Sequence, residues 1–308
     1  MKYTCTGRAM DKNNKVIGYL LISDMGMHLT MKSDELKERM KAGTMIVTNL
    51  KLTSNNRLIL TNASANSIGT AEFKKKAEEY RKQLTNIIKT TGKAPDNLSG
   101  YTITKLYNTS KQEFYILSLS DSVHILIIPD HLEHVILGNY DNPLRKIRGS
   151  VYVVGGENLI SSSTLFGQCQ LDTVDITAMK TQKLEEAEYM FAGSNIKEIV
   201  ANKLKTPVLR NIKGMFHGST ILKLNLTFVR QPYNESRKEL DRLNMESMFS
   251  CCRADSIKFS VNITNDAVAN DMFSFAAIAE LNIKGIDFKK VTQQERLFNG
   301  ATIGNLIK

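Results

Sequence analysis

The sequence predicts an α+β N-terminal region followed by a solenoid of stacked parallel strands with short helical returns. Two observations support this fold class. The first 65 residues mix short alternating apolar segments with one short helical pattern. In the second half of the chain a phenylalanine recurs at intervals of 25, 25, 33, 24 and 25 residues, and an alternating apolar run follows it each time. A fixed period of about 20 to 50 residues is typical of repeat architectures.

The composition indicates a globular chain with basic character. The 308 residues are 42% hydrophobic, which is enough to fill the cores of two or three domains. There are 41 basic and 31 acidic residues, a formal net charge of +10, which favours an acidic protein surface or a polyanion as partner. The N-terminal segment lacks the apolar core of a signal peptide, and the longest apolar runs are too short to cross a bilayer. We therefore expect a cytoplasmic protein that does not bind a membrane.

Residues 1–65 form the first predicted domain, a small α+β module. A helix is expected to begin near Ser33, which is a good N-cap residue, and to stop at Gly43. Strands are expected over residues 2–10, 16–22, 28–31, 44–52 and 57–62.

Residues 66–145 form the second predicted domain, a basic helix followed by a β-meander. The helix is expected at about 70–91, because apolar residues recur with helical spacing and Gly92 and Pro95 follow. The meander is expected at 101–107, 113–119 and 122–128. The other face of the helix is either a solvated surface or a phosphate-binding stripe, and it carries Lys74, Lys75, Lys76, Arg81 and Lys82.

Residues 146–308 form the third predicted domain, the solenoid, which a strand at about 150–155 begins. Its anchors are Phe166, Phe191, Phe216, Phe249, Phe273 and Phe298. The positions five, eight and ten residues after each anchor are apolar in seventeen of eighteen cases, so they are expected to line the interior. The third position after the anchor is always small, so Cys169 and Cys252 are predicted to be packing residues.

This pattern resembles the bacterial surface-antigen type of leucine-rich repeat, the BspA-like family, whose repeats begin with Met-Phe and continue with spaced leucines. The third domain, 146–308, is therefore expected to be a leucine-rich-repeat solenoid. The resemblance implies a binding scaffold without catalysis or cofactor. The chain is also similar to repeat proteins that phages and mobile elements of gut bacteria carry, which implies the cytoplasm of a bacterial host as its location.

No catalytic motif or metal-ligand spacing is present. The four cysteines form no Cys-x-x-Cys pair, and His131 and His134 have no neighbours that complete a metal site. Neither a nucleophile motif nor a phosphate loop occurs. We expect no enzyme activity, no metal and no cofactor.

Binding residues are expected at the outward strand positions, seven and nine residues after each anchor. The charges there are mixed, which favours a protein partner over nucleic acid. The predicted binding residues on the strands are Asp175, Glu198, Lys223, Asn225, Lys258, Glu280 and Asn282.

The repeat of 33 residues contains an insertion with the residues Arg230, Tyr233, Arg237 and Lys238. They are expected either to form a binding loop or to belong to a tolerated loop and a longer helix.

The sequence stops within an expected strand. We therefore expect a second copy of the chain, its N-terminal half or a partner to cover that end of the solenoid.

The sequence thus predicts a non-enzymatic protein-recognition scaffold. The favoured setting is a phage-encoded antagonist or adaptor that binds a host protein complex. The alternatives are a nucleic-acid-associated protein that uses the basic helix and the insertion, and an inhibitor of a host nuclease defence system.

Overall fold

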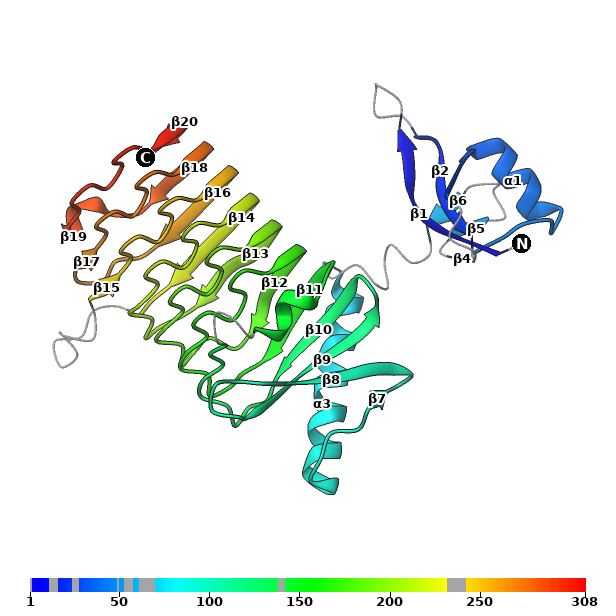
Figure 1. The fold of residues 1–308 in the computed structure, drawn as a ribbon, viewed down its shortest axis with the longest axis horizontal. Coiled ribbons are helices and arrows are strands. Elements are labelled where there is room, and N and C mark those ends of the chain that lie inside the picture. The colour runs from blue at the N-terminus through cyan, green and yellow to red at the C-terminus, as the bar shows by residue number, and fades with distance from the viewer. Residues whose placement is uncertain are drawn as a thin grey trace. The chain divides into compact units, whose positions relative to one another are not determined.

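The computed structural model describes residues 2–10, 16–23, 28–48, 50–52, 58–60, 70–137, 142–231 and 242–308. The chain divides into two compact units, Met1–Lys75 and Lys76–Lys308. Figure 1 shows the elements of both units.

The first unit is a small α+β fold. Its main sheet has the order β3-β2-β1-β4, in which β1 pairs antiparallel with β2 and parallel with β4. Helix α1 (Ser33–Lys41) places Leu36, which is 0% exposed, in a core with Tyr19, Leu21 and Met31. The strands are β1 (Lys2–Met10), β2 (Val16–Ser23), β3 (His28–Lys32), β4 (Ile46–Thr48), β5 (Leu50–Leu52) and β6 (Leu58–Leu60).

These elements confirm the α+β character and the helix that the sequence predicts for residues 1–65, and each expected strand region contains a strand. Two details are wrong. The single strand expected at 44–52 is two strands, β4 and β5, which belong to different sheets. Ser33 is the first helical residue, and Lys32 occupies the N-cap position without a side-chain cap.

The second unit is built on one sheet of eleven strands. Strands β7 to β10 form an antiparallel meander, and β11 and every later strand of the sheet join in parallel. The strands of this sheet are β7 (Asn97–Leu98), β8 (Tyr101–Tyr107), β9 (Glu113–Ser120), β10 (Val123–Ile128), β11 (Ser150–Gly155), β12 (Gln170–Met179), β13 (Asn195–Lys205), β14 (Thr220–Val229), β16 (Arg253–Val261), β18 (Ala277–Gly285) and β20 (Thr302–Ile307).

Helix α3 (Ala71–Thr91) packs on one face of this sheet, over the meander. Alternate residues of β9 and β10, such as Phe114 and Leu126, point to the solenoid core on the opposite face. Their neighbours Tyr115 and Ile127 point toward α3 and are buried as well. Both faces of these strands are therefore covered, which explains their continuous apolar sequences.

From β10 onward the chain is a parallel β-solenoid, as the repeat predicts. The anchor phenylalanines stack in register, and the ring centroids of Phe191 and Phe216 are 5.3 Å apart with an interplanar angle of 7°. The same contact joins every consecutive pair from Phe166 to Phe298 at 5.1 to 5.3 Å. The strand columns also align, because Val174, Ile199 and Leu224 are paired across neighbouring strands.

The return segments are turns, so the prediction of helical returns is wrong. Two residues before and two after each anchor, the backbone is left-handed, with φ between 52° and 64° at all twelve positions. A left-handed residue ends helical hydrogen bonding. The anchor amides instead bond to the next rung, as when Phe191 N–H donates to the carbonyl of Met215 at 2.8 Å.

Short parallel bridges and 3-10 turns complete the return side. Residues 242–249, which one interpretation of the insertion placed in a helix, form a strand and a turn. The elements of the return side are β15 (Leu243–Asn244), β17 (Ala267–Val268), β19 (Val291–Gln293), η1 (Pro143–Lys146) and η3 (Phe288–Lys290).

The thiols of this unit are expected to react very unequally. Cys169 and Cys252 are fully buried, which confirms their predicted packing role, and burial raises the pKa of the Cys169 thiol to about 12 and that of Cys252 to about 11. Cys251 is exposed. Iodoacetamide should therefore modify Cys251 in the native protein and spare the other two, because the thiolate is the reactive form.

Peptide mapping by mass spectrometry measures this reactivity. All three thiols should react in denaturant, which is the control. Alkylation of native Cys169 or Cys252 as fast as Cys251 would show that the interior is not packed as described.

Candidate functional site

The predicted binding residues on the strands converge on one exposed surface. We call it the sheet face, the side of β12 to β20 that faces away from the phenylalanine stack. On it Glu198 pairs with Lys223 on the neighbouring strand, and Asn225 pairs with Lys258. The residues that the structure brings together there are Glu198, Lys223, Asn225, Lys258, Glu280 and Asn282.

The charges of the sheet face are mixed in sign and partly paired. Lys223 Nζ lies 3.0 Å from Glu198 Oε1, and Lys197 Nζ lies 2.7 Å from Asp172 Oδ1. A groove for a polyanion would be mainly basic. Both signs occur among the exposed charged residues of these strands, and the basic ones are more numerous. The acidic residues are Asp172, Glu198, Asp255 and Glu280, and the basic ones are Lys197, Lys203, Lys205, Lys223, Arg253, Lys258 and Lys284.

Two predicted binding residues do not reach the surface. Asp175 is 1% exposed, and its Oδ1 accepts hydrogen bonds from the backbone N–H and the hydroxyl of Thr177. Asp175 pairs with Tyr152 on β11. Burial raises the pKa of Tyr152 most, and the charge of Glu78 on α3 contributes to the shift, so this strand pair lies close to the helix.

Arg230 is 4% exposed, and its Nε donates to the carbonyl of Leu209 at 2.7 Å. It therefore bridges neighbouring rungs and does not belong to an exposed loop. The other predicted insertion residues, Tyr233, Arg237 and Lys238, lie outside the described residues.

Sequence reasoning missed Phe275. Its side chain is 62% exposed although its backbone is left-handed with φ 56°. Its ring lies beside Gly300, where an added Cβ would come within 2.6 Å of it. All six anchored rungs are left-handed at this position, so the conformation belongs to the repeat, and Phe275 differs by its large exposed apolar side chain.

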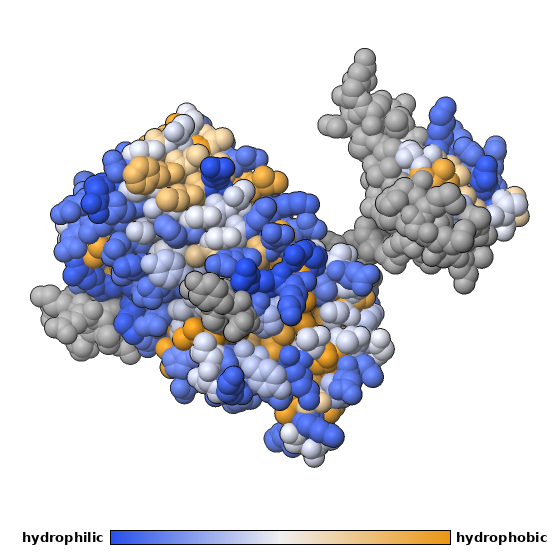
Figure 2. All heavy atoms as spheres, in the orientation of Figure 1, coloured by the Kyte–Doolittle hydropathy of each residue, from blue (hydrophilic) through white to orange (hydrophobic). Residues whose placement is uncertain are grey.

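Phe275 is followed by two small exposed residues on β18, Ala277 and Ala279. We call these three residues the Phe275 patch. Figure 2 shows apolar surface around β18 and β20. The signal was present in the sequence, because the second position after the anchor is glycine in three other rungs.

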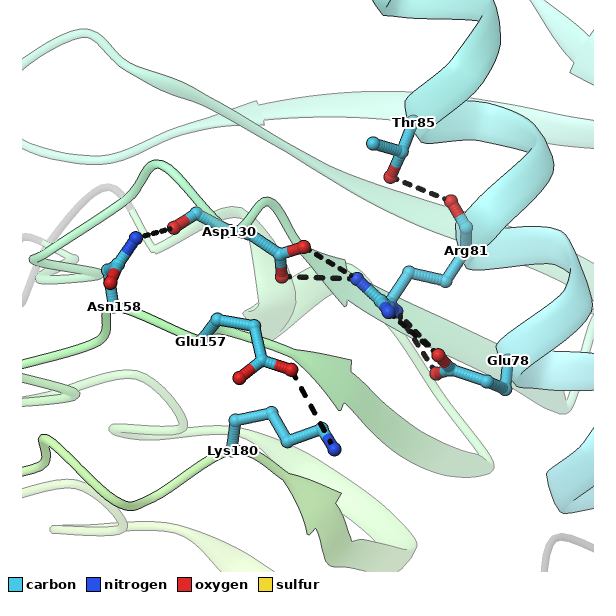
Figure 3. Close-up of polar contacts among 7 residues, drawn as sticks. All are labelled: Glu78, Arg81, Thr85, Asp130, Glu157, Asn158 and Lys180. Carbon is cyan, nitrogen blue, oxygen red and sulfur yellow. Dashed lines mark hydrogen bonds and ion pairs between the residues drawn. The ribbon is translucent and has the colours of Figure 1, made fainter.

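Helix α3 is fixed to the sheet by Arg81 (Figure 3). Arg81 Nη1 lies 2.8 Å from Asp130 Oδ2, after β10, and Arg81 Nη2 lies 2.7 Å from Glu78 Oε1 on the same helix. The hydrogen bond from Arg81 lowers the pKa of the Glu78 carboxyl, and the same bond raises the pKa of Arg81. Arg81 therefore serves to dock the helix and is not part of a phosphate-binding stripe.

A serine and a histidine lie within hydrogen-bond distance at the edge of the meander. His124 Nδ1 is 3.0 Å from Ser118 Oγ, and Nε2 is 2.9 Å from the carbonyl oxygen of Arg148. The two residues are paired on β9 and β10. Because the imidazole is 5% exposed, these contacts satisfy a buried polar group. Among the described residues, no group of three or more His, Cys, Asp or Glu side chains could hold a metal ion.

Burial of His124 is expected to make the second unit less stable in mild acid. Burial lowers the pKa of this imidazole, against smaller opposing effects of its hydrogen bond to Arg148. A depressed histidine pKa contributes stability above the ordinary value of about 6.5, and this stability is lost as the pH falls toward the lowered pKa. The free energy of unfolding should therefore decrease between about pH 7 and pH 5.

Chemical denaturation across this pH range measures the slope. His124→Gln should show a shallower slope, and His131→Gln, which alters an exposed histidine, is the matched control. Identical slopes in the two variants would contradict the assignment.

Comparisons with models of protein families, with curated proteins and with solved structures found no match for this chain. None of the helices in the described parts of the chain is long and apolar enough to cross a membrane.

Proposed function

We propose that this chain is a non-enzymatic recognition scaffold that binds another protein through the sheet face and the Phe275 patch. One observation carries the proposal. The buried columns keep the same apolar character from rung to rung, whereas the exposed position six residues after the anchor is in turn Asp172, Lys197, Leu222, Asp255, Ala279 and Gly304. A constant interior with a varied exterior is what a binding scaffold needs.

The chemistry of these surfaces favours a protein with a mixed-charge surface and an apolar contact. Charges of both signs on the sheet face provide specificity for a complementary charge pattern. Phe275 provides a large, exposed apolar side chain of the kind that anchors interfaces. The exposed basic residues of α3, Lys75 and Lys82, support nucleic acid as the second candidate.

Photo-crosslinking from defined positions tests this proposal. A benzoylphenylalanine at position 258 or 280 should capture a protein in cells of the source organism, and one at exposed Gln83 on α3 should not. The double variant Lys258→Glu and Phe275→Ala should lower the affinity for the captured protein at least about tenfold, which is about 1.4 kcal/mol.

Equal capture from positions 83 and 258, or capture unaffected by the double variant, would overturn the proposal. Capture that nuclease removes, with affinity that falls steeply between about 50 and 200 mM salt, would favour nucleic acid instead.

We also propose that the repeat is of the leucine-rich BspA-like type. The Met-Phe anchors and their regular stacking support this assignment.

A further inference from the structure

The second unit contains an apolar cleft that protein binding at the sheet face does not use. It lies between the C-terminal half of α3 and strands β9 and β10, and its volume is about 330 Å³. Leu84, Tyr115 and Ile127 are buried and form its floor, and Ile88 and Pro129 form its walls. Clefts of about 300 to 1,000 Å³ with mostly apolar walls are typical of small-molecule sites.

The floor offers little to a polar ligand. The hydroxyl of Tyr115 donates to Glu113 Oε2 at 2.9 Å, and Glu113 does not line the cleft. The ring of Tyr115 therefore acts as an apolar surface toward the cleft. A ligand gains most here by burying a hydrocarbon or aromatic body.

The rim of the cleft carries Lys89, Asp130 and His131. Asp130 is already held by Arg81, whose Nη1 lies 3.1 and 2.8 Å from its two carboxylate oxygens. Lys89 is exposed, and no ion pair within the described parts of the chain includes it. At the rim, the ammonium group of Lys89 is therefore available to a ligand, whereas the carboxylate of Asp130 is paired with Arg81.

We propose that this cleft binds a small apolar acid, a molecule with a hydrocarbon or aromatic body and a single carboxylate. The body lies against Leu84 and Ile127, and the carboxylate lies at the rim beside Lys89. A charge-assisted hydrogen bond from the ammonium group, with His131 as a second donor, orients the ligand. This binding is independent of the protein recognition proposed above.

Titration of the full chain with octanoate tests the site, with octan-1-ol and octylammonium as matched probes of equal chain length. Isothermal titration calorimetry should show saturable binding of one octanoate per chain. Octan-1-ol should bind about tenfold more weakly, because it lacks the charge that Lys89 recognises, and octylammonium should bind more weakly still.

Two variants and a control locate the binding. Lys89→Glu should weaken octanoate binding at least about tenfold, and Ile88→Asp should abolish it, because a carboxylate then stands in the apolar wall. Lys82→Glu removes an exposed cation from the same helix outside the cleft and should leave the affinity unchanged. If Ile88→Asp does not fold, Lys89→Glu and Lys82→Glu still decide the question.

Three results would overturn the proposal. They are the absence of saturable octanoate binding, equal losses in Lys89→Glu and Lys82→Glu, and binding of octylammonium as tight as that of octanoate.

Discussion

Replacing Phe216 with alanine is expected to lower the free energy of unfolding of the second unit by about 3 to 5 kcal/mol. The ring is fully buried between Phe191 and Phe249, at centroid distances of 5.3 and 5.1 Å. Its removal leaves a cavity and ends two stacking contacts at once. Because each rung of a solenoid contacts only its neighbours, the damage should be centred on β13, β14 and β16.

Urea denaturation measures the total loss, and hydrogen exchange of the amides of these three strands shows where it occurs. Phe275→Ala is the matched control. It also removes a phenyl ring from the repeat region, but an exposed one, and should change stability by no more than about 0.5 kcal/mol. A comparable loss in both variants would mean that the buried stack does not hold the solenoid together.

Replacing Gly155 with alanine is expected to destabilise the second unit by about 2 to 6 kcal/mol, the sum of a steric clash and backbone strain of about 1 to 3 kcal/mol each. Gly155 ends β11 with φ 90°, and an added Cβ would lie 2.2 Å from the carbonyl oxygen of Ile128. It would also lie 3.2 Å from Cδ of Arg81. The substitution therefore disturbs both the first parallel strand pair and the docking of α3.

Gly218→Ala separates these effects. Gly218 also has a positive φ, of 62°, but nothing lies within 4 Å of its added Cβ. Only the left-handed backbone penalty of about 1 to 2 kcal/mol should remain. Thermal unfolding of both variants provides the comparison, and a loss in Gly218→Ala as large as that in Gly155→Ala would rule out the clash as the cause.

The stacking of the solenoid could be predicted from the sequence because its physical basis is local and repeated. A side chain such as Phe216 has one place in its rung, and the fixed spacing places Phe191 and Phe249 above and below it. The same spacing predicts that Glu198 lies beside Lys223 on the sheet face, as the strand pairing confirms.

The repeat spacing does not predict that the segments that connect successive strands are turns and not helices. The left-handed positions are occupied more often by residues such as Thr164, Tyr189 and Phe275 than by glycine, so the usual composition signal is weak. Short turns and short helices of equal length also bury the same residues.

The burial of Asp175 and Arg230 depends on neighbours that are distant in the sequence. Asp175 lies at the margin of the region under α3, a helix that precedes the solenoid by a long segment. Arg230 finds the carbonyl of Leu209 one rung away. Repeat periodicity describes the average rung, and it carries no information on contacts that occur in only one of them.

Because the turns of the return side are equivalent from rung to rung, the number of repeats can change without a new kind of turn. The six anchored rungs turn at equivalent left-handed residues, and the first five donate the anchor amide to the next rung in the same way. Excision of residues 192–216 would join equivalent backbone positions, so a shorter protein could close without a new turn. Gain or loss of whole copies is thus an accessible way for such a chain to change the area it presents.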